Sequence, residues 1–411
     1  MRYGRSETKK RIRLLSIDTT PEVTVDYFLS DEQQMMVDLS RRIAQEKMKP
    51  VREHYDESGE FPWPIIKELA QADLCGVYIP QEYGGFGCGV FGLVLVVEEL
   101  CKVDGGIALA LAATALGAFP ILIGASEEQK KKYLPDIASG KKLAAFGLTE
   151  PEAGSDATGM RTTAKKDGDH YILNGTKCFI TNAGEAETYT VFAKTNPDRG
   201  ARGISCFILE KGMPGFEFGK KENKMGIRAS VTRELIFNNC RVPKANLLGK
   251  EGHGLLVAQA TLDASRPGVA AQALGIAAGA LDEAVNYART RVQFGQPIAS
   301  FQGIQHMLAN MATEVEAARC LVYQTARMMD ANPGKRTTKE SAMAKLFASE
   351  TAMKVTTDAV QVFGGYGYIK EYPVEKMMRD AKITTLYEGT SQIQRNEIAL
   401  SLIKEAAARK Q

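Results

Sequence analysis

The sequence predicts an α+β protein in which a helical domain, a β domain and a second helical domain follow one another. Apolar residues recur every three or four positions up to about residue 137, alternate with polar ones as far as about residue 248, and then return to helical spacing. The expected parts are an N-terminal extension of residues 1–27, a helical domain of 28–142, a β domain of 143–254 and a helical domain of 255–411.

The first helical domain opens with SDEQQMMVDLSRRIAQEK, in which Ser30 is the expected N-cap and Glu32 and Gln33 lie in the first turn. Further on, residues 105–126 (GGIALALAATALGAFPILIGAS) carry no charge. Their length of about 20 residues would suit a membrane span. The stretch is Ala-rich, contains Pro120 and has no flanking Lys/Arg or aromatic anchors, so we expect a buried core helix and no transmembrane segment.

A glycine pattern, GxGxxG, occurs at Gly87, Gly89 and Gly92. Dinucleotide binding by this pattern requires a strand before it, a helix after it and an acidic residue about 20 positions on, within one βαβ unit. The segment instead lies among helical patterns, so we expect a turn between helices and no nicotinamide site.

The β domain is predicted from short alternating runs such as HYILNGTKCFITN and RGISCFILEK. Asn174-Gly175 lies between two such runs and predicts a tight two-residue hairpin. Three later segments of about 25 residues or more have helical periodicity, which predicts a bundle of crossing helices.

Composition excludes several classes of function. The formal charge of +3 is spread along the chain, which argues against nucleic acid as a partner. The 7 cysteines form no CxxC pair and the 4 histidines lack ligand spacing, so neither disulfides nor a metal site is expected. Residues 1–27 have no apolar signal core, which predicts a bacterial cytoplasmic protein, with the mitochondrial matrix as the alternative.

Three segments carry candidate chemistry. GLTEPEAGSDATG (147–159) offers backbone N–H groups and the hydroxyls of Thr149 and Ser155, donors that suit phosphates or ring carbonyls, although the pattern alone also fits a simple turn. In KCFIT (177–181), Phe179 could lie flat on a planar ring system beside the Thr181 hydroxyl, although by itself it would be a core aromatic. In TTLYEGTSQIQR (384–395), the acid Glu388 directly follows an apolar-flanked run.

These segments resemble the acyl-CoA dehydrogenase family of flavoenzymes. The resemblance covers nearly the whole chain from about Phe28 and extends to TLDASR (261–266), RTRVQFGQPI (289–298), QVFGGYGYIKEYPVEKMMRDAKI (361–383) and YEGTSQIQR (387–395). It implies an N-terminal α-helical domain, a barrel-like middle β domain and a C-terminal four-helix bundle.

The resemblance also implies a reaction. An acyl-CoA loses its α-proton to a glutamate, here Glu388, while the β-hydrogen leaves as hydride to flavin N5 and a trans-2-enoyl-CoA forms. Electrons then pass to an electron-transfer flavoprotein. A proton beside a thioester is hard to remove, so the base must be desolvated and the enolate oxygen must meet donors, one of them the backbone N–H of Glu388. This explains a carboxylate among apolar residues.

Binding residues follow from the same resemblance. The FAD contacts expected within one subunit are Phe146, Leu148, Thr149, Ser155, Phe179, Thr181, Thr390 and Gln392. Those expected from a neighbouring subunit, at the flavin's phosphates and adenine, are Arg291, Gln293, Phe294, Gln361, Gly364 and Gly365. The acyl-CoA contacts are Ser155, Asp263, Arg266, Tyr387 and Gly389. A flavin shared between chains makes a homo-oligomer, expected to be a tetramer, part of the function.

Several alternatives stay open at this point. The apolar stretch IALALAATALG (107–117) favours an uncharged acyl tail of short to medium length, with branched and aryl-substituted tails open. An enoyl-CoA reductase of an electron-bifurcating complex would use the same site in reverse. A catalytically silent scaffold could dispense with Glu388, Thr181 or the Gly364-Gly365 pair, yet the chain retains all of them.

Overall fold

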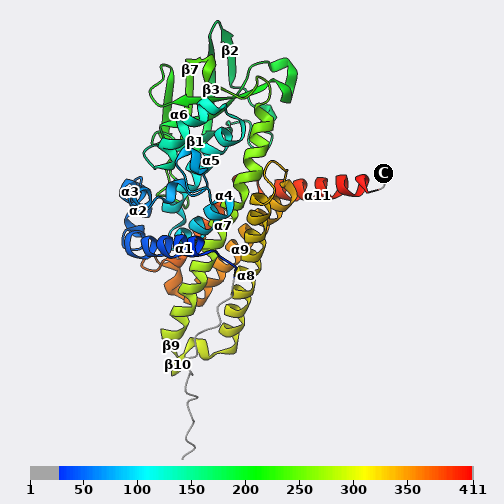
Figure 1. Ribbon diagram of the computed structural model, residues 1–411. Coiled ribbons are helices and arrows are strands. Elements are labelled where there is room, and N and C mark those ends of the chain that lie inside the picture. Colours follow the sequence, from blue (N-terminus) through cyan, green and yellow to red (C-terminus); the bar gives the residue numbers. More distant parts are fainter. Residues whose placement is uncertain (1–26, 410–411) are drawn as a thin grey trace, which may run out of the picture.

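The computed structural model describes residues 27–409, so the expected extension 1–27 lies almost entirely outside the described residues. A helical block, a sheet and a second helical block follow one another along the chain (Figure 1), which confirms the predicted class. The helices of the first block are α1 (Asp31–Ile43), α2 (Arg52–Ser58), α3 (Trp63–Gln71), α4 (Gly89–Cys101), α5 (Gly105–Gly124) and α6 (Glu127–Ala138).

Helix α1 begins with the predicted cap. The Ser30 hydroxyl accepts from the Gln33 backbone N–H at 3.2 Å, and the Gln33 side chain accepts from the Ser30 N–H at 3.0 Å. This reciprocal pair satisfies two of the N–H groups that a helix start leaves without partners.

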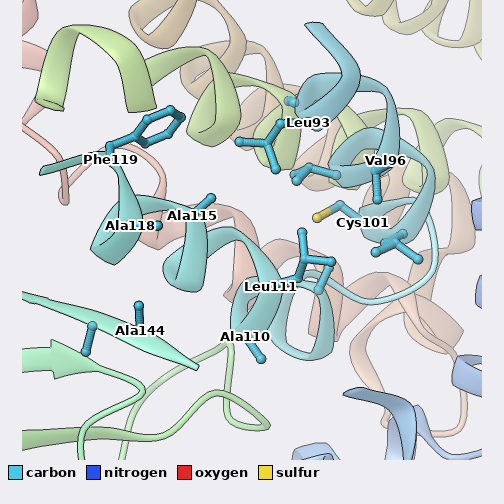
Figure 2. Close-up of a cluster of buried hydrophobic side chains, with 14 of the residues drawn as sticks. Leu93, Val96, Cys101, Ala110, Leu111, Ala115, Ala118, Phe119 and Ala144 are labelled. Atoms are coloured by element: carbon cyan, nitrogen blue, oxygen red, sulfur yellow. The ribbon is translucent and has the colours of Figure 1, made fainter. Parts of the chain in front are cut away.

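Helix α5 is the apolar segment of residues 105–124, and it is a core helix. In Figure 2, Leu111 and Phe119 of α5 and Leu93 of α4 point into one shared core. At Gly117 a side chain would meet the backbone N of Ala145 at 2.5 Å, so glycine lets α5 pack closely on the sheet. Within residues 27–409, α5 is the one helix long and apolar enough to cross a membrane, and 78% of its apolar window is buried in the fold.

The GxGxxG segment forms a turn between helices, as predicted. It follows the 3-10 turn Gln81–Tyr83 and leads into α4. The N–H groups of Val90 and Phe91, at the start of α4, each donate to the Asp330 carboxylate at 2.8 Å. The anion-binding end of α4 is therefore already occupied by a carboxylate of the chain itself.

The middle block is one sheet. Its strands are β1 (Ala144–Gly147), β2 (Thr163–Asp167), β3 (His170–Thr181), β4 (Thr188–Lys194), β5 (Ile204–Glu210), β6 (Phe216–Lys221), β7 (Thr232–Pro243) and β8 (Leu247–Leu248). The hydrogen-bonded order is β6-β7-β3-β2-β4-β5-β8, and β1 pairs parallel to β4.

The hairpin predicted at Asn174-Gly175 is wrong, because β3 runs straight through both residues. The β2–β3 turn lies earlier, at Gly168 and Asp169, where Asp167 pairs with His170. Gly175 instead marks an irregularity in the pairing of β3 with β7, with a φ of +143°. Bulges and tight turns use the same backbone freedom of glycine, which is why the dipeptide alone was misread.

The last block contains the three long helices that the periodicity predicts: α7 (Gly254–Thr290), α8 (Gln302–Asp330) and α9 (Thr338–Phe363). Helix α7 has 37 residues, which at 1.5 Å per residue is about 55 Å. It leads from the β domain to a small hairpin, β9 (Val292–Gln293) and β10 (Gln296–Pro297), at the opposite end of the molecule (Figure 1). Two shorter helices, α10 (Val374–Ile383) and the projecting α11 (Ser391–Ala408), complete the chain.

Candidate active site

Glu388 lies in the turn between α10 and α11. The residue is half-buried, and its Oε2 accepts a hydrogen bond of 2.6 Å from the Ser265 hydroxyl of α7. Burial raises the pKa of Glu388, while the Ser265 hydrogen bond and the cations Arg266 and Lys345 oppose part of the rise. A carboxylate with a raised pKa is a stronger base than one in water.

The backbone of this turn is held in an unusual conformation. Glu388 has a φ of +50° and Gly389 a φ of +88°. Lys345 of α9 donates to the Gly389 carbonyl at 2.7 Å, and Gln394 of α11 donates to the carbonyls of Glu388 and Gly389 at 3.0 Å each. Lys345 and Gln394 are both 0% exposed, so the turn is fixed from inside the fold.

Two groups of Glu388 are left without protein partners. Within residues 27–409, its backbone N–H donates to no protein acceptor, and its Oε1 accepts from no protein donor. This arrangement suits a substrate whose proton moves to the Glu388 carboxylate while its enolate oxygen accepts a hydrogen bond from the Glu388 backbone N–H.

Tyr387 and a small apolar cluster lie beside the base. The cluster, separate from the main core, consists of Leu109, Ala113 and Ile227 with Ala112, Ile383 and Tyr387 packed against it. The Tyr387 hydroxyl donates to the Gln272 side chain, which in turn donates to the Gly105 carbonyl at 3.1 Å. Tyr387 is thereby tied to the start of α5, the helix expected to line the acyl tail.

A buried ion cluster holds the walls of this region together. The Lys376 ammonium lies between the carboxylates of Asp104 and Asp380, at 2.8 Å and 2.5 Å respectively. Asp104 caps α5, and Asp380 accepts from the N–H of Ile227 in the apolar cluster. Burial alone would lower the pKa of Lys376, but the two carboxylates raise it, so the ammonium stays charged.

The predicted coenzyme A residues Asp263 and Arg266 lie together on α7, with Arg266 donating to Asp263 at 3.2 Å. Arg336 and Thr338 also donate to the Asp263 carboxylate, at 3.0 Å and 2.7 Å. The Arg336 side chain is 61% exposed, so it presents a cation at the surface that sequence reasoning missed.

The residues predicted to face the flavin ring lie at the ends of β1 and β3. Phe146, Leu148, Thr149 and Thr181 are half-buried, whereas Phe179 is 67% exposed with a φ of +57°. The interpretation of Phe179 as a core aromatic is therefore excluded. Ser155 lies exposed in the loop that follows β1.

A buried ion pair, also missed from the sequence, fixes that loop to β3. The Lys177 ammonium donates to the Leu148 carbonyl at 3.0 Å and to the Glu150 carboxylate at 2.7 Å. Glu150 also accepts from the N–H groups of Arg161 and Thr162, so both ends of the loop meet at one carboxylate. Burial lowers the pKa of Lys177 to about 8.

The residues predicted to serve a neighbouring subunit gather at the far end of α7. A cavity of about 460 Å³ is lined by Tyr287, Arg291, Gln293, Ile298, Val362, Phe363, Gly364, Gly365, Tyr366 and Ile369. The Arg291 guanidinium in this lining lies 5.1 Å from the centre of the Tyr366 ring. Within residues 27–409 no carboxylate forms an ion pair with Arg291. Phe294, 91% exposed, and Gln361 lie outside this lining.

Two further predicted contacts follow the base. The Thr390 hydroxyl accepts from the Ile393 N–H at 3.2 Å and so caps α11, while Gln392 is exposed. The hairpin of β9 and β10, which contributes Gln293 to the cavity of Arg291, lies at the opposite end of the molecule from the β domain that contains the predicted flavin-ring residues (Figure 1).

Family models cover most of the chain. The N-terminal, middle and C-terminal domains of acyl-CoA dehydrogenase match residues 30–141, 145–240 and 252–403. The chain belongs to the acyl-CoA dehydrogenase family.

Solved structures and curated relatives agree with this membership. Butyryl-CoA dehydrogenase of Megasphaera elsdenii is 49% identical with a TM-score of 0.89, over 92% of this chain and 100% of that one. A structure described as the electron transferring flavoprotein of Acidaminococcus fermentans, in work on electron bifurcation, is 53% identical with a TM-score of 0.90, over 92% and 99%. Acryloyl-CoA reductase (NADH) of Anaerotignum propionicum is 49% identical over 95% of this chain and 99% of its own length.

FAD is the cofactor of the acyl-CoA dehydrogenase family. The residues present fit it: Phe179 offers an uncovered aromatic face near the Thr181 hydroxyl, and Arg291 offers an unpaired guanidinium beside two exposed glycines, Gly364 and Gly365. These groups could hold a planar ring and a diphosphate respectively.

Sequence reasoning missed the residues that hold the base. Ser265 lies inside the quoted TLDASR, but its hydroxyl was given no role. Lys345 had a detectable signal, because it is a cation within the otherwise apolar and small run SAMAKLFAS. Its target, the Gly389 carbonyl, is a backbone atom 44 residues away, which no side-chain pattern indicates.

Proposed function

We propose that the protein catalyses FAD-dependent α,β-dehydrogenation of an acyl-CoA thioester to a trans-2-enoyl-CoA. The observation that carries the proposal is the half-buried Glu388 carboxylate, whose pKa is raised by burial and whose Oε1 has no hydrogen-bond donor among residues 27–409. Bound FAD supplies the acceptor for the β-hydride. Family membership supports the same reaction.

In this proposal the chain's own residues have distinct tasks. Glu388 takes the α-proton while Ser265 holds its other oxygen, and the free backbone N–H of Glu388 meets the enolate oxygen. Tyr387 encloses the thioester and excludes water. Enclosure strengthens both the base and the hydrogen bond to the developing charge.

We propose a short, uncharged acyl tail as substrate. The cluster of Leu109, Ala113 and Ile227 beside Tyr387 offers an apolar surface, which suits an uncharged tail. The similarity to a butyryl-CoA dehydrogenase supports a short tail. For coenzyme A, Asp263 and Arg266, joined by the exposed Arg336, form the candidate polar contacts.

We further propose that two copies share each FAD, within a homotetramer. Ser265, which holds Glu388, and Arg291, which lines the cavity, are 26 positions apart along α7, which at 1.5 Å per residue is about 39 Å. An extended dinucleotide is shorter than that, so one FAD can lie beside Glu388 and also in an Arg291 cavity only if a second chain supplies one of them. We place the protein in the bacterial cytoplasm, where its similarity to bacterial relatives fits.

Electron-transfer flavoprotein is the proposed electron acceptor, which the similarity to the Acidaminococcus structure supports. The second candidate function is reduction of an enoyl-CoA, favoured by the similarity to an acryloyl-CoA reductase. Both use the same Glu388, as base in one direction and as acid in the other.

The experiment is anaerobic mixing of the purified yellow protein with butyryl-, hexanoyl-, octanoyl-, isobutyryl- and phenylpropanoyl-CoA. We expect the flavin absorption to bleach fastest with butyryl-CoA. Absence of bleaching with every acyl-CoA would contradict the proposal. Re-oxidation of the bleached protein by crotonyl-CoA, compared with electron-transfer flavoprotein, separates the two directions.

A further inference from the structure

Lys345 is an unusual lysine. Its side chain is 0% exposed in the middle of α9, and its Nζ donates to the Gly389 carbonyl at 2.7 Å. Within residues 27–409 no carboxylate lies within ion-pair distance of it, and the carboxylate whose charge acts on it most strongly is Glu388. A buried ammonium without an ion-pair partner is costly, so its presence calls for a function.

We infer that Lys345 is the positioning residue of the base: it fixes the Glu388–Gly389 turn, and its positive charge keeps the Glu388 carboxylate ionised while water is excluded. The inference rests on the proposed role of Glu388 as the base. In this inference α9 contributes to proton abstraction through Lys345, which acts on Glu388 and touches neither substrate nor flavin.

The first half of the inference follows from backbone geometry. Positive φ at a glutamate is sparsely populated and persists only where the surroundings impose it. Here Lys345 from α9 and Gln394 from α11 bind the carbonyls of the turn from two different helices. Loss of either donor would leave a buried carbonyl with fewer partners and the turn free to relax.

The second half follows from charge. A neutral donor such as glutamine could bind the Gly389 carbonyl equally well, so hydrogen bonding alone does not explain a lysine. Burial pushes the pKa of Glu388 upward, and a nearby cation in a poorly hydrated interior pushes it back. Burial lowers the pKa of Lys345 itself to about 8, so the ammonium is retained at neutral pH.

One other cation acts on the base. Arg266 on α7 lowers the pKa of Glu388 more strongly than Lys345 does, but its guanidinium is shared with the Asp263 carboxylate, whereas Lys345 has no ion-pair partner among residues 27–409. Ser265 on α7 is neutral, and the remaining groups near the turn, Tyr387, Cys101 of α4, Asp380 of α10 and Glu350 of α9, are neutral or acidic. Lys376 of α10 is a further cation in this region, but its charge is balanced by the carboxylates of Asp104 and Asp380.

The test measures the titration of Glu388 directly, by infrared difference spectroscopy of its carboxyl stretch in the flavin-loaded protein. The band is assigned by its loss in Glu388→Gln. Lys345→Gln retains a hydrogen-bond donor without charge, Lys345→Arg retains the charge, and Lys354→Met removes an exposed lysine of the same helix as a control. Flavin content and thermal unfolding are recorded for each.

We expect the midpoint of Glu388 to rise by about one pH unit in Lys345→Gln, and to stay near the wild-type value in Lys345→Arg and Lys354→Met. The acid limb of kcat should move to higher pH by the same amount. An unchanged midpoint in Lys345→Gln, with lower thermal stability alone, would overturn the inference and leave a structural role. If instead no acyl-CoA bleaches the wild-type flavin, the proposed function fails while the carboxyl titration still reports on Lys345.

Discussion

The two ends of α7 contrast in how completely one chain builds them. Near Ser265 the proposed base Glu388 is half-buried, and the residues that hold its turn, Lys345 and Gln394, are 0% exposed. Beyond Thr290, Phe294 is 91% exposed, and Arg291 lines a cavity and has no carboxylate partner in the part of the chain that the structure describes. One fold thus supplies all the residues that we propose for proton abstraction, whereas the end proposed to bind the flavin phosphates presents exposed groups.

This difference has a physical origin. A base gains strength from exclusion of water, so it is built by packing and by hydrogen bonds from several helices. A cofactor that enters and bridges two chains requires uncovered cations, glycines and aromatic faces.

The largest effect is expected at the base itself. Glu388→Gln preserves shape and should retain FAD and acyl-CoA binding, while turnover falls roughly a hundred- to ten-thousand-fold, because a general base contributes that much. Steady-state rates and equilibrium binding of butyryl-CoA provide the check. Retention of most activity would mean that another group removes the proton.

Lys376→Met tests the buried ion cluster that holds the enclosed end together. It leaves Asp104 and Asp380 without their cation, and removal of one partner from a buried ion pair costs roughly 3–5 kcal/mol. Denaturant unfolding should show this loss, whereas Lys382→Met, at an exposed position on the same helix, should change stability little. Equal stability of the two variants would show that the ion cluster does not stabilise this region.

Arg291→Ala tests the open end. We expect flavin content and oligomer size to fall together, because the guanidinium is proposed to hold the phosphates of a FAD shared between copies. Absorbance measures the flavin content and light scattering the oligomer size. The matched control is Arg289→Ala, at an exposed arginine two positions earlier that does not line the cavity. Unchanged flavin content with unchanged size would argue against a shared site.

The smallest effect is expected from Ser265→Ala. The hydroxyl stabilises the ionised carboxylate of Glu388 and so lowers its pKa, which means that its loss raises the pKa. The acid limb of kcat should therefore move to higher pH by up to about one unit, since a hydrogen bond to a charged group contributes roughly 1.5 kcal/mol. A shift toward lower pH would contradict this assignment.

The sequence predicted the order of helical and β parts because periodicity is a local property of the chain. The cap at Ser30 and the three long helices followed from the same local rules, while Asn174-Gly175 was misread because a bulge and a turn need the same glycine. The site was found through short segments that resemble a family. Lys345, Gln394 and Lys177 escaped because each binds a backbone carbonyl whose position only the folded chain determines.

The central claim is that Glu388 removes the α-proton, and it is tested most directly without hydride transfer. In 3-thiabutyryl-CoA the β-position is sulfur, so no hydride can leave, but the α-protons can still exchange with deuterium oxide. Mass spectrometry of the recovered thioester should show rapid exchange with the wild-type protein and almost none with Glu388→Gln. Equal exchange with both proteins would contradict the account.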